Sequence, residues 1–246
     1  MKNYNWQISL GIILVIISAI VYLIHYAIFR DAHHIFIYLI GDIAFVFIEV
    51  LMVILVIQSL LDMREKRERL EKLNMLIGVF FSEVGTSLLV LFSDSDPSLE
   101  KIKQNLIVNS DWSNKEFEHI NNHLRNYEYK INIDMINLKD LRDFLIRKSN
   151  FLVRLLENPN LLEHESFTEV LRAVFHIVEE LEHRKNIKQL SKNDLNHMEV
   201  DINRGYNLLV FEWLNHMKYL KNNYPYMFSL AMRLNPFDEN ATVEIK

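Results

Sequence analysis

The chain has 246 residues, a formal net charge of −5 at pH 7 and no cysteine. The missing cysteine excludes disulfides and thiolate chemistry, and the acidic balance provides no basic footprint for a nucleic-acid partner. Only 5 glycines and 4 prolines are present, which favours helices over sheets and turns, so we expect an all-α fold.

The charged residues are unevenly distributed along the chain. Residues 1–61 contain five of the 59 Asp, Glu, Lys and Arg residues, and the other 54 lie in residues 62–246. The mean hydropathy near zero therefore averages an apolar segment with a polar domain. The polar part, about 185 residues, is long enough to bury one sizeable core.

Two apolar runs, residues 8–29 and 35–61, are each long enough to cross a bilayer, which needs about 20 residues. Only residues 30–34 separate them, so we expect a transmembrane helical hairpin over residues 1–61. The first run is longer than the apolar region of a signal peptide, and no small-x-small cleavage site follows it. It therefore favours a retained anchor.

Basic residues directly after the second run predict the orientation of this hairpin. They are Arg64, Lys66, Arg67, Arg69 and Lys72. Because positive residues stay on the cytoplasmic side, the C-terminal domain is expected in the cytoplasm, and two spans place the N-terminus there as well. The expected location is the cytoplasmic (inner) membrane, with the lipid bilayer as a partner.

The helical pattern continues beyond the second run. Apolar residues between positions 70 and 91 are spaced by three and four, which is a heptad-like seam. We therefore expect a helical stalk over residues 62–92. The segment 93–97, Ser-Asp-Ser-Asp-Pro, predicts its end.

The remaining chain shows repeated helix starts and is expected to form a cytoplasmic helical bundle over residues 93–237, with a polar tail over 238–246. Asp96 before Pro97 resembles an N-cap followed by proline at the first helical position. Capping boxes are expected at Ser113, Ser166 and Ser191. Amphipathic stretches lie near residues 134–157, 166–186 and 192–223.

Two acids, Asp42 and Glu49, interrupt the second apolar run. A carboxylate near the bilayer midplane costs about 2.5–3.5 kcal/mol on insertion scales. Seven residues are two helical turns, so both acids face nearly the same way. Folding the hairpin brings His25 to the depth of Asp42, so a His25–Asp42 pair is geometrically reasonable.

Two interpretations of these acids remain open. In the first they fix packing: Asp42 pairs with His25, and Glu49 is protonated or bonds to Ser18 or a neighbouring chain. In the second, one Glu49 from each chain of a homo-oligomer forms a ring that selects cations or relays protons. Two spans cannot enclose a pore, so the second interpretation requires self-association.

Two groups of residues have ligand types that suit a divalent metal. Asp31, His33 and His34 in the turn between the runs suit a transition metal such as zinc, although polar residues also belong at a membrane interface. In the soluble part, His176 and Glu180 share a helix face, and Glu180 with His183 has the E-x-x-H spacing of di-iron bundles. No second E-x-x-H is present.

A site that combines Glu83, His176, Glu180 and His216 is therefore one hypothesis. The alternative is a solvated helix face, with His176 or Glu83 satisfied by hydrogen bonds in the core. No Gly-x-Ser-x-Gly element supports nucleophilic catalysis, and no glycine-rich loop could hold phosphates. The sequence leans against an enzyme.

Several stretches together resemble a widespread family of uncharacterised prokaryotic two-span membrane proteins with a helical cytoplasmic domain. They are residues 30–38, 41–50, 81–85, 156–167 and 219–237. The resemblance covers nearly the whole chain and implies a prokaryotic cytoplasmic-membrane location. It carries no functional residue to this sequence.

Three functions are compatible with these features. The first is a homo-oligomeric integral membrane protein, channel-like or sensory, with its intramembrane acids on an ion or proton path. The second is a non-conducting scaffold or sensor that binds a cytoplasmic protein partner through the helical bundle. The third is a metal-dependent membrane enzyme.

Overall fold

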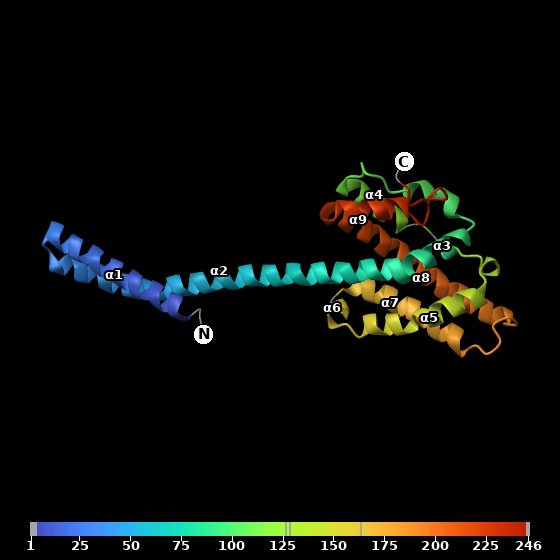
Figure 1. Cartoon of the computed structure of the whole chain (residues 1–246), viewed down its shortest axis with the longest axis horizontal. Coiled ribbons are helices and arrows are strands. Elements are labelled where there is room, and N and C mark those ends of the chain that lie inside the picture. Colours follow the sequence, from blue (N-terminus) through green and yellow to red (C-terminus); the bar gives the residue numbers. More distant parts are fainter. Residues whose placement is uncertain (1–3, 126, 128, 163, 245–246) are drawn as a thin grey trace. The chain divides into compact units, whose positions relative to one another are not determined.

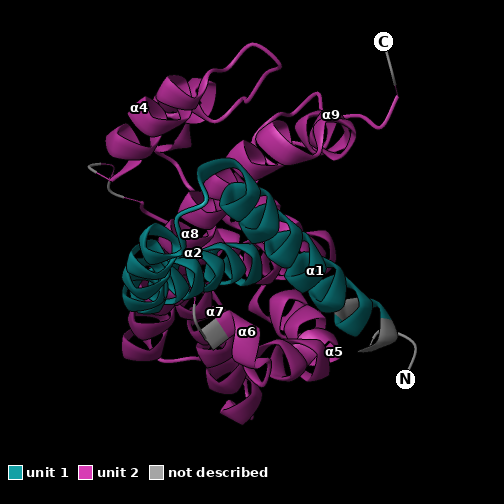
Figure 2. Ribbon diagram, turned by 90° about the vertical axis from the view of Figure 1, so that its left-hand side faces the viewer, with its two compact units in different colours: residues 1–66 teal, residues 67–246 magenta. Residues whose placement is uncertain are grey.

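The computed structural model describes residues 4–125, 127, 129–162 and 164–244. These residues form nine α-helices and no strand, so the expected all-α fold is confirmed (Figure 1). Contacts divide the chain into two compact units, Met1–Lys66 and Arg67–Lys246 (Figure 2). Residues 1–3 of the predicted hairpin and 245–246 of the predicted tail lie outside the described residues.

The first unit is a helical hairpin with a two-residue connection. Helix α1 spans Tyr4–Phe29, and α2 begins at Ala32. Arg30 adopts a left-handed conformation with φ of 47°, and its N–H donates to the Tyr26 carbonyl at 2.9 Å. The Asp31 carboxylate accepts the N–H groups of His33 at 2.9 Å and His34 at 3.2 Å. Asp31 thereby caps α2, as short polar side chains commonly do.

Most exposed side chains of the hairpin are apolar. Its two helices contain segments that are long and apolar enough to cross a membrane, and the most apolar part of each has no buried residue. A helix that is apolar all round is stable when protein or lipid surrounds it. A single hairpin does not provide that surrounding for itself.

Helix α2 spans Ala32–Phe80 and continues through a π-helical turn, Phe81–Gly85, into α3, Thr86–Asp94. The helical run thus ends inside the segment 93–97, where the sequence predicted its end. A Cβ atom on Gly85 would lie 2.6 Å from Cδ1 of Phe81 and 2.9 Å from Cε1 of Phe80. Glycine is therefore needed for these rings to pack against the turn.

The segment expected to be a stalk is largely part of the second unit. Contacts place residues 67–92 with residues 93–237, and eight of its side chains are buried: Leu73, Ile77, Phe80, Phe81, Val84, Leu88, Leu89 and Phe92. The Phe80 ring lies 5.2 Å from Phe167, and the Phe92 ring lies 6.0 Å from Tyr206. The apolar seam packs within its own chain, which accounts for the difference.

The second unit is built around one long helix, α8, which contacts α3, α4, α7 and α9. Helix α5 packs against α7, and the short α6 connects them. The bounds are α4 Asn114–Leu124, α5 Leu138–Leu156, α6 Pro159–Leu162, α7 Glu165–His183, α8 Lys192–Asn223 and α9 Pro225–Arg233. Short 3₁₀ turns lie at Leu99–Lys101, Lys103–Asn105 and Ile133–Met135.

Two of the predicted helix caps are present. The Ser113 hydroxyl accepts the Glu116 N–H at 3.3 Å, and the Glu116 carboxylate accepts the Ser113 N–H. The Ser191 hydroxyl accepts the Asp194 N–H at 3.1 Å and begins α8. Local sequence was sufficient here because both partners lie within one helical turn.

Two other predicted starts are wrong. Helix α7 begins at Glu165 with His164 as its N-cap, whose Nδ1 accepts the Phe167 N–H at 3.3 Å. Ser166 lies inside the helix, and its hydroxyl bonds elsewhere. The Asp96 carboxylate accepts the Ser98 N–H at 2.8 Å, but the turn leads into 3₁₀ turns rather than an α-helix.

Candidate functional site

The hairpin contains a cavity of about 280 Å³ that both His25 and Asp42 line. The His25 ring stacks on His34 with centroids 6.0 Å apart, and His34 lies 4.7 Å from the Tyr38 ring. Nδ1 of His25 is buried and forms no hydrogen bond within the described part of the chain. Among the hydrogen bonds of the described residues, none joins His25 to Asp42. His25 and Asp42, the predicted pair, thus line the same cavity, but no hydrogen bond between them is present among the described residues.

Glu49 lies outside this cavity and is exposed, as is Asp42. Both acids are on α2, two turns apart. Within the part of the chain that the structure describes, neither has a hydrogen bond or an ion pair. The surface of one hairpin therefore presents two uncovered carboxyl groups among apolar side chains.

The turn residues do not assemble into a metal site. The Asp31 carboxylate caps α2, and the His34 ring lies against His25 and Tyr38. In the described chain, no group of three ligand atoms forms here. The capping requirement of a tight hairpin explains why an acid is found at this position.

The four-residue metal hypothesis for the second unit also needs correction. Glu83 is exposed and pairs with Lys148 of α5 at 2.7 Å. His216 is buried and stacks on Phe81 with centroids 5.5 Å apart. Nδ1 of the exposed His183 lies 2.8 Å from the Glu179 carbonyl oxygen. Among the residues described, neither Glu83 nor His216 joins a metal-binding group.

The structure instead brings two i,i+4 pairs together across the α7–α8 hairpin. His176 and Glu180 on α7 face His197 and Asp201 on α8. Nε2 of His176 lies 3.2 Å from Oδ2 of Asp201, and Nε2 of His197 lies 3.3 Å from the same oxygen. The Glu180 carboxylate lies 4.0 Å from Nε2 of His176 and 3.7 Å from Nε2 of His197.

Sequence reasoning found His176 and Glu180 but missed His197 and Asp201. The signal was available: His-x₃-Glu before the connection and His-x₃-Asp after it run in the same order, so an antiparallel helical pair places each histidine opposite an acid. Residues 184–191 form the short connection that sets this register.

Arg184 holds the Glu180 carboxylate beside the two imidazoles. Its guanidinium donates to the Glu180 carboxylate and lies 3.7 Å from Oδ1 of Asp194. The hydrogen bond from Arg184 is the main cause that lowers the pKa of Glu180. Glu180 therefore remains a carboxylate near neutral pH.

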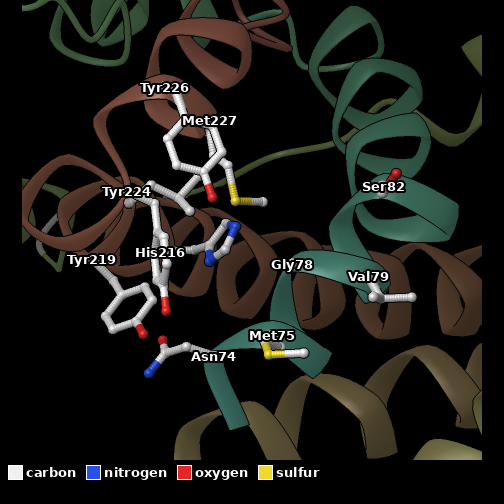
Figure 3. Close-up of a pocket in the computed structure, with 11 residues that line it drawn as sticks. Asn74, Met75, Gly78, Val79, Ser82, His216, Tyr219, Tyr224, Tyr226 and Met227 are labelled. Carbon is white, nitrogen blue, oxygen red and sulfur yellow. The ribbon is translucent and has the colours of Figure 1, made fainter. Parts of the chain in front are cut away.

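A second feature is the cavity beside His216, of about 460 Å³ (Figure 3). Its wall is mostly apolar and aromatic, with residues from α2, the π-helical turn, α8 and α9, among them Met75, Val79, Tyr219, Tyr224, Tyr226 and Met227. Burial lowers the pKa of His216 to about 4. The imidazole in this wall is therefore neutral at pH 7.

Glu212, one turn before His216, is a buried carboxyl group with one hydroxyl donor. It is 3% exposed, and the Ser166 hydroxyl donates to Oε2 at 2.8 Å. Burial raises the pKa of Glu212 and outweighs the opposing effect of the Ser166 hydrogen bond. The Ser166 hydroxyl thus bonds to a residue of α8 and does not cap α7.

Replacing Glu212 by Gln is expected to stabilise the folded protein at pH 7 by about 1 kcal/mol, the usual size of a single-site effect. Gln still accepts from Ser166 and carries no charge. Because the folded pKa of Glu212 is raised, wild-type stability falls as the pH rises above the unfolded value of about 4.3. The gain should therefore vanish at pH 3.5 in thermal unfolding. Exposed Glu182→Gln is the control, and a less stable Glu212→Gln protein at pH 7 would contradict the account.

Comparison with known proteins gives two family models that match the chain. The model described as "MJ1433, N-terminal helical domain" matches residues 1–61, and "Uncharacterized protein MJ1433, C-terminal helical domain" matches residues 69–233. A relative, Uncharacterized protein MJ1433 of Methanocaldococcus jannaschii, is 44% identical over 243 residues, which cover 99% of this chain and 98% of the relative. No solved structure matches the chain.

Proposed function

The chain belongs to the family of Uncharacterized protein MJ1433, and from this premise we propose that it is a homo-oligomeric integral membrane protein of a channel-like or sensory kind. Its hairpin crosses the cytoplasmic (inner) membrane, with both termini in the cytoplasm. Asp42 and Glu49 face a polar axis that several copies of the hairpin share. The helical second unit is the cytoplasmic part.

The apolar surface of the hairpin supports the membrane location. The windows Ile8–Phe29 and the beginning of α2 have no buried residue, and a water-soluble protein rarely exposes so large an apolar surface. The basic residues between positions 64 and 72 support the cytoplasmic location of the second unit. A lipid bilayer accounts for both features, because it covers the apolar surface and orients the basic segment toward the cytoplasm.

The observation that carries the self-association is the uncovered pair Asp42 and Glu49. Acids in a membrane span face protein or a water-filled path, because lipid does not solvate them. One hairpin covers neither carboxyl group. A second copy of the same surface supplies the cover, and acids on one helix face then approach a common axis.

The test uses the full chain reconstituted in liposomes and analysed in detergent. Glu49→Gln is expected to abolish proton or cation flux and to weaken assembly about tenfold, since an interhelical polar contact is worth about 1–2 kcal/mol. Asp62→Asn, an acid on the same helix beyond the apolar run, is the matched control and should change neither quantity.

The outcomes separate the proposed functions. Glu49→Gln protein with unchanged flux and unchanged assembly would overturn the proposal. An oligomer that loses stability in this variant but conducts no ion in the wild type would favour the non-conducting sensor or scaffold.

A further inference from the structure

The side chains between α7 and α8 include a buried carboxylate oxygen that no hydrogen bond satisfies. Asp201 is 8% exposed, and its Oδ2 has no hydrogen-bond donor in the described chain. Nε2 of His176 and Nε2 of His197 nevertheless lie within 3.3 Å of it. The three atoms therefore gather between the two helices at ion-pair distances without a hydrogen bond that joins them. Buried acceptors without partners are rare in native structures.

The distances fit a small metal ion. Bonds of 2.0–2.1 Å around tetrahedral zinc place the ligand atoms about 3.3 Å apart. The two N···O distances are 3.2 and 3.3 Å, and all three ligand atoms lie within 4.8 Å of one another. Two imidazoles with one carboxylate form a donor set that borderline divalent ions such as Zn²⁺ and Fe²⁺ prefer.

The charges around this point also fit a divalent cation. Asp201, Glu180 and Asp194 contribute three formal negative charges and Arg184 one positive charge, which leaves a formal net charge of minus two beside the two imidazoles. The side chains of His176 and His197 are 38% and 53% exposed. An ion can therefore reach the ligands from solvent although Asp201 is buried.

We propose that His176, His197 and Asp201 bind a divalent transition metal of the zinc class. Three protein ligands leave a fourth position for solvent or a small ligand, as in zinc sites that are not purely structural. Glu180 is the carboxylate beside this position and is held there by Arg184. The metal joins α7 to α8 and therefore stabilises the helical pair against separation. The site does not depend on what the membrane hairpin does.

The test titrates metal-stripped full-length protein in detergent with Zn²⁺ and measures bound metal after equilibrium dialysis. One saturable Zn²⁺ per chain is expected, together with a higher unfolding temperature. His197→Gln and Asp201→Asn should each weaken binding by at least about 100-fold, since even residues that only orient ligands contribute 10–100-fold. His183→Gln, an exposed histidine on α7 outside the site, should bind Zn²⁺ as the wild type does.

His197 is half exposed, so its replacement is expected to leave the fold intact, and circular dichroism checks this. His197→Gln thus remains decisive if Asp201→Asn fails to fold. Absence of saturable Zn²⁺ binding, or unchanged affinity in folded His197→Gln, would overturn the proposal. An equal loss in His183→Gln would overturn it as well. These outcomes do not depend on whether the hairpin conducts ions or assembles, so the metal site and the proposed function are tested independently.

Discussion

Lowering the pH from 7 to 4 is expected to remove about 3 kcal/mol from the free energy of unfolding through His216 alone. Burial lowers the pKa of this imidazole to about 4, whereas an unfolded histidine titrates near 6.5. The unfolded chain therefore binds a proton first as the pH falls. The stabilising effect of neutral His216 is complete above pH 6.5 and is lost progressively down to pH 4.

The variant His216→Phe isolates this contribution. A phenyl ring can keep the stacking on Phe81, has room in the adjoining cavity and cannot take a proton. Chemical unfolding of both proteins at pH 7 and pH 4 should show that the variant loses about 3 kcal/mol less. His123→Phe, at an exposed position of α4, should leave the pH dependence unchanged. Equal losses in wild type and His216→Phe would show that His216 is not the acid-sensitive group.

Replacing Phe80 by Ala is expected to lower the free energy of unfolding by about 3–5 kcal/mol. Phe80 is fully buried, and its ring meets those of Phe81 and Phe167 edge-on at 5.4 and 5.2 Å. Truncation removes the apolar contacts, leaves a cavity and loses both aromatic pairs. Chemical unfolding followed by the fluorescence of Trp112 and Trp213 measures the effect.

The matched control is the neighbouring residue Val79, which is 46% exposed on the same helix. Val79→Ala should change stability by less than about 1 kcal/mol, because little apolar area is lost. Similar small effects at both positions would mean that the end of α2 is a separate stalk. A large difference would show that it belongs to the core of the second unit.

The fold features that sequence could predict depend on local rules. The apolar runs predicted the hairpin helices, and the boxes at Ser113 and Ser191 predicted helix starts, because periodicity and capping act over one or two turns. The scarcity of glycine and proline favoured helices, and the described residues contain no strand. These properties need no knowledge of the rest of the chain.

The errors concern contacts between distant parts of the chain. Ser166 has the sequence of a cap, but its hydroxyl bonds to Glu212, 46 residues away. A spacing of three and four cannot tell whether an apolar seam meets a second copy or α7 and α8 of its own chain. The register of α7 against α8 places His176 beside His197 and Asp201, and the packing of α5 places Lys148 in an ion pair with Glu83. Tertiary packing decides such pairings.

The π-helical turn at Phe81–Gly85 determines how the side chains after it are rotated about the helix axis relative to those before it. Each residue of an α-helix advances the side chains by about 100°, so the wider turn sets which direction Leu88, Leu89 and Phe92 face relative to Leu73 and Ile77. Because this turn holds one residue more than an α-helical turn, removing one residue within it would restore an α-helical turn and leave Leu88, Leu89 and Phe92 facing the interior. A one-residue deletion in the α-helical segment on either side would instead rotate the side chains that follow it by about 100°, so the chain should tolerate a deletion better within these five positions than beside them.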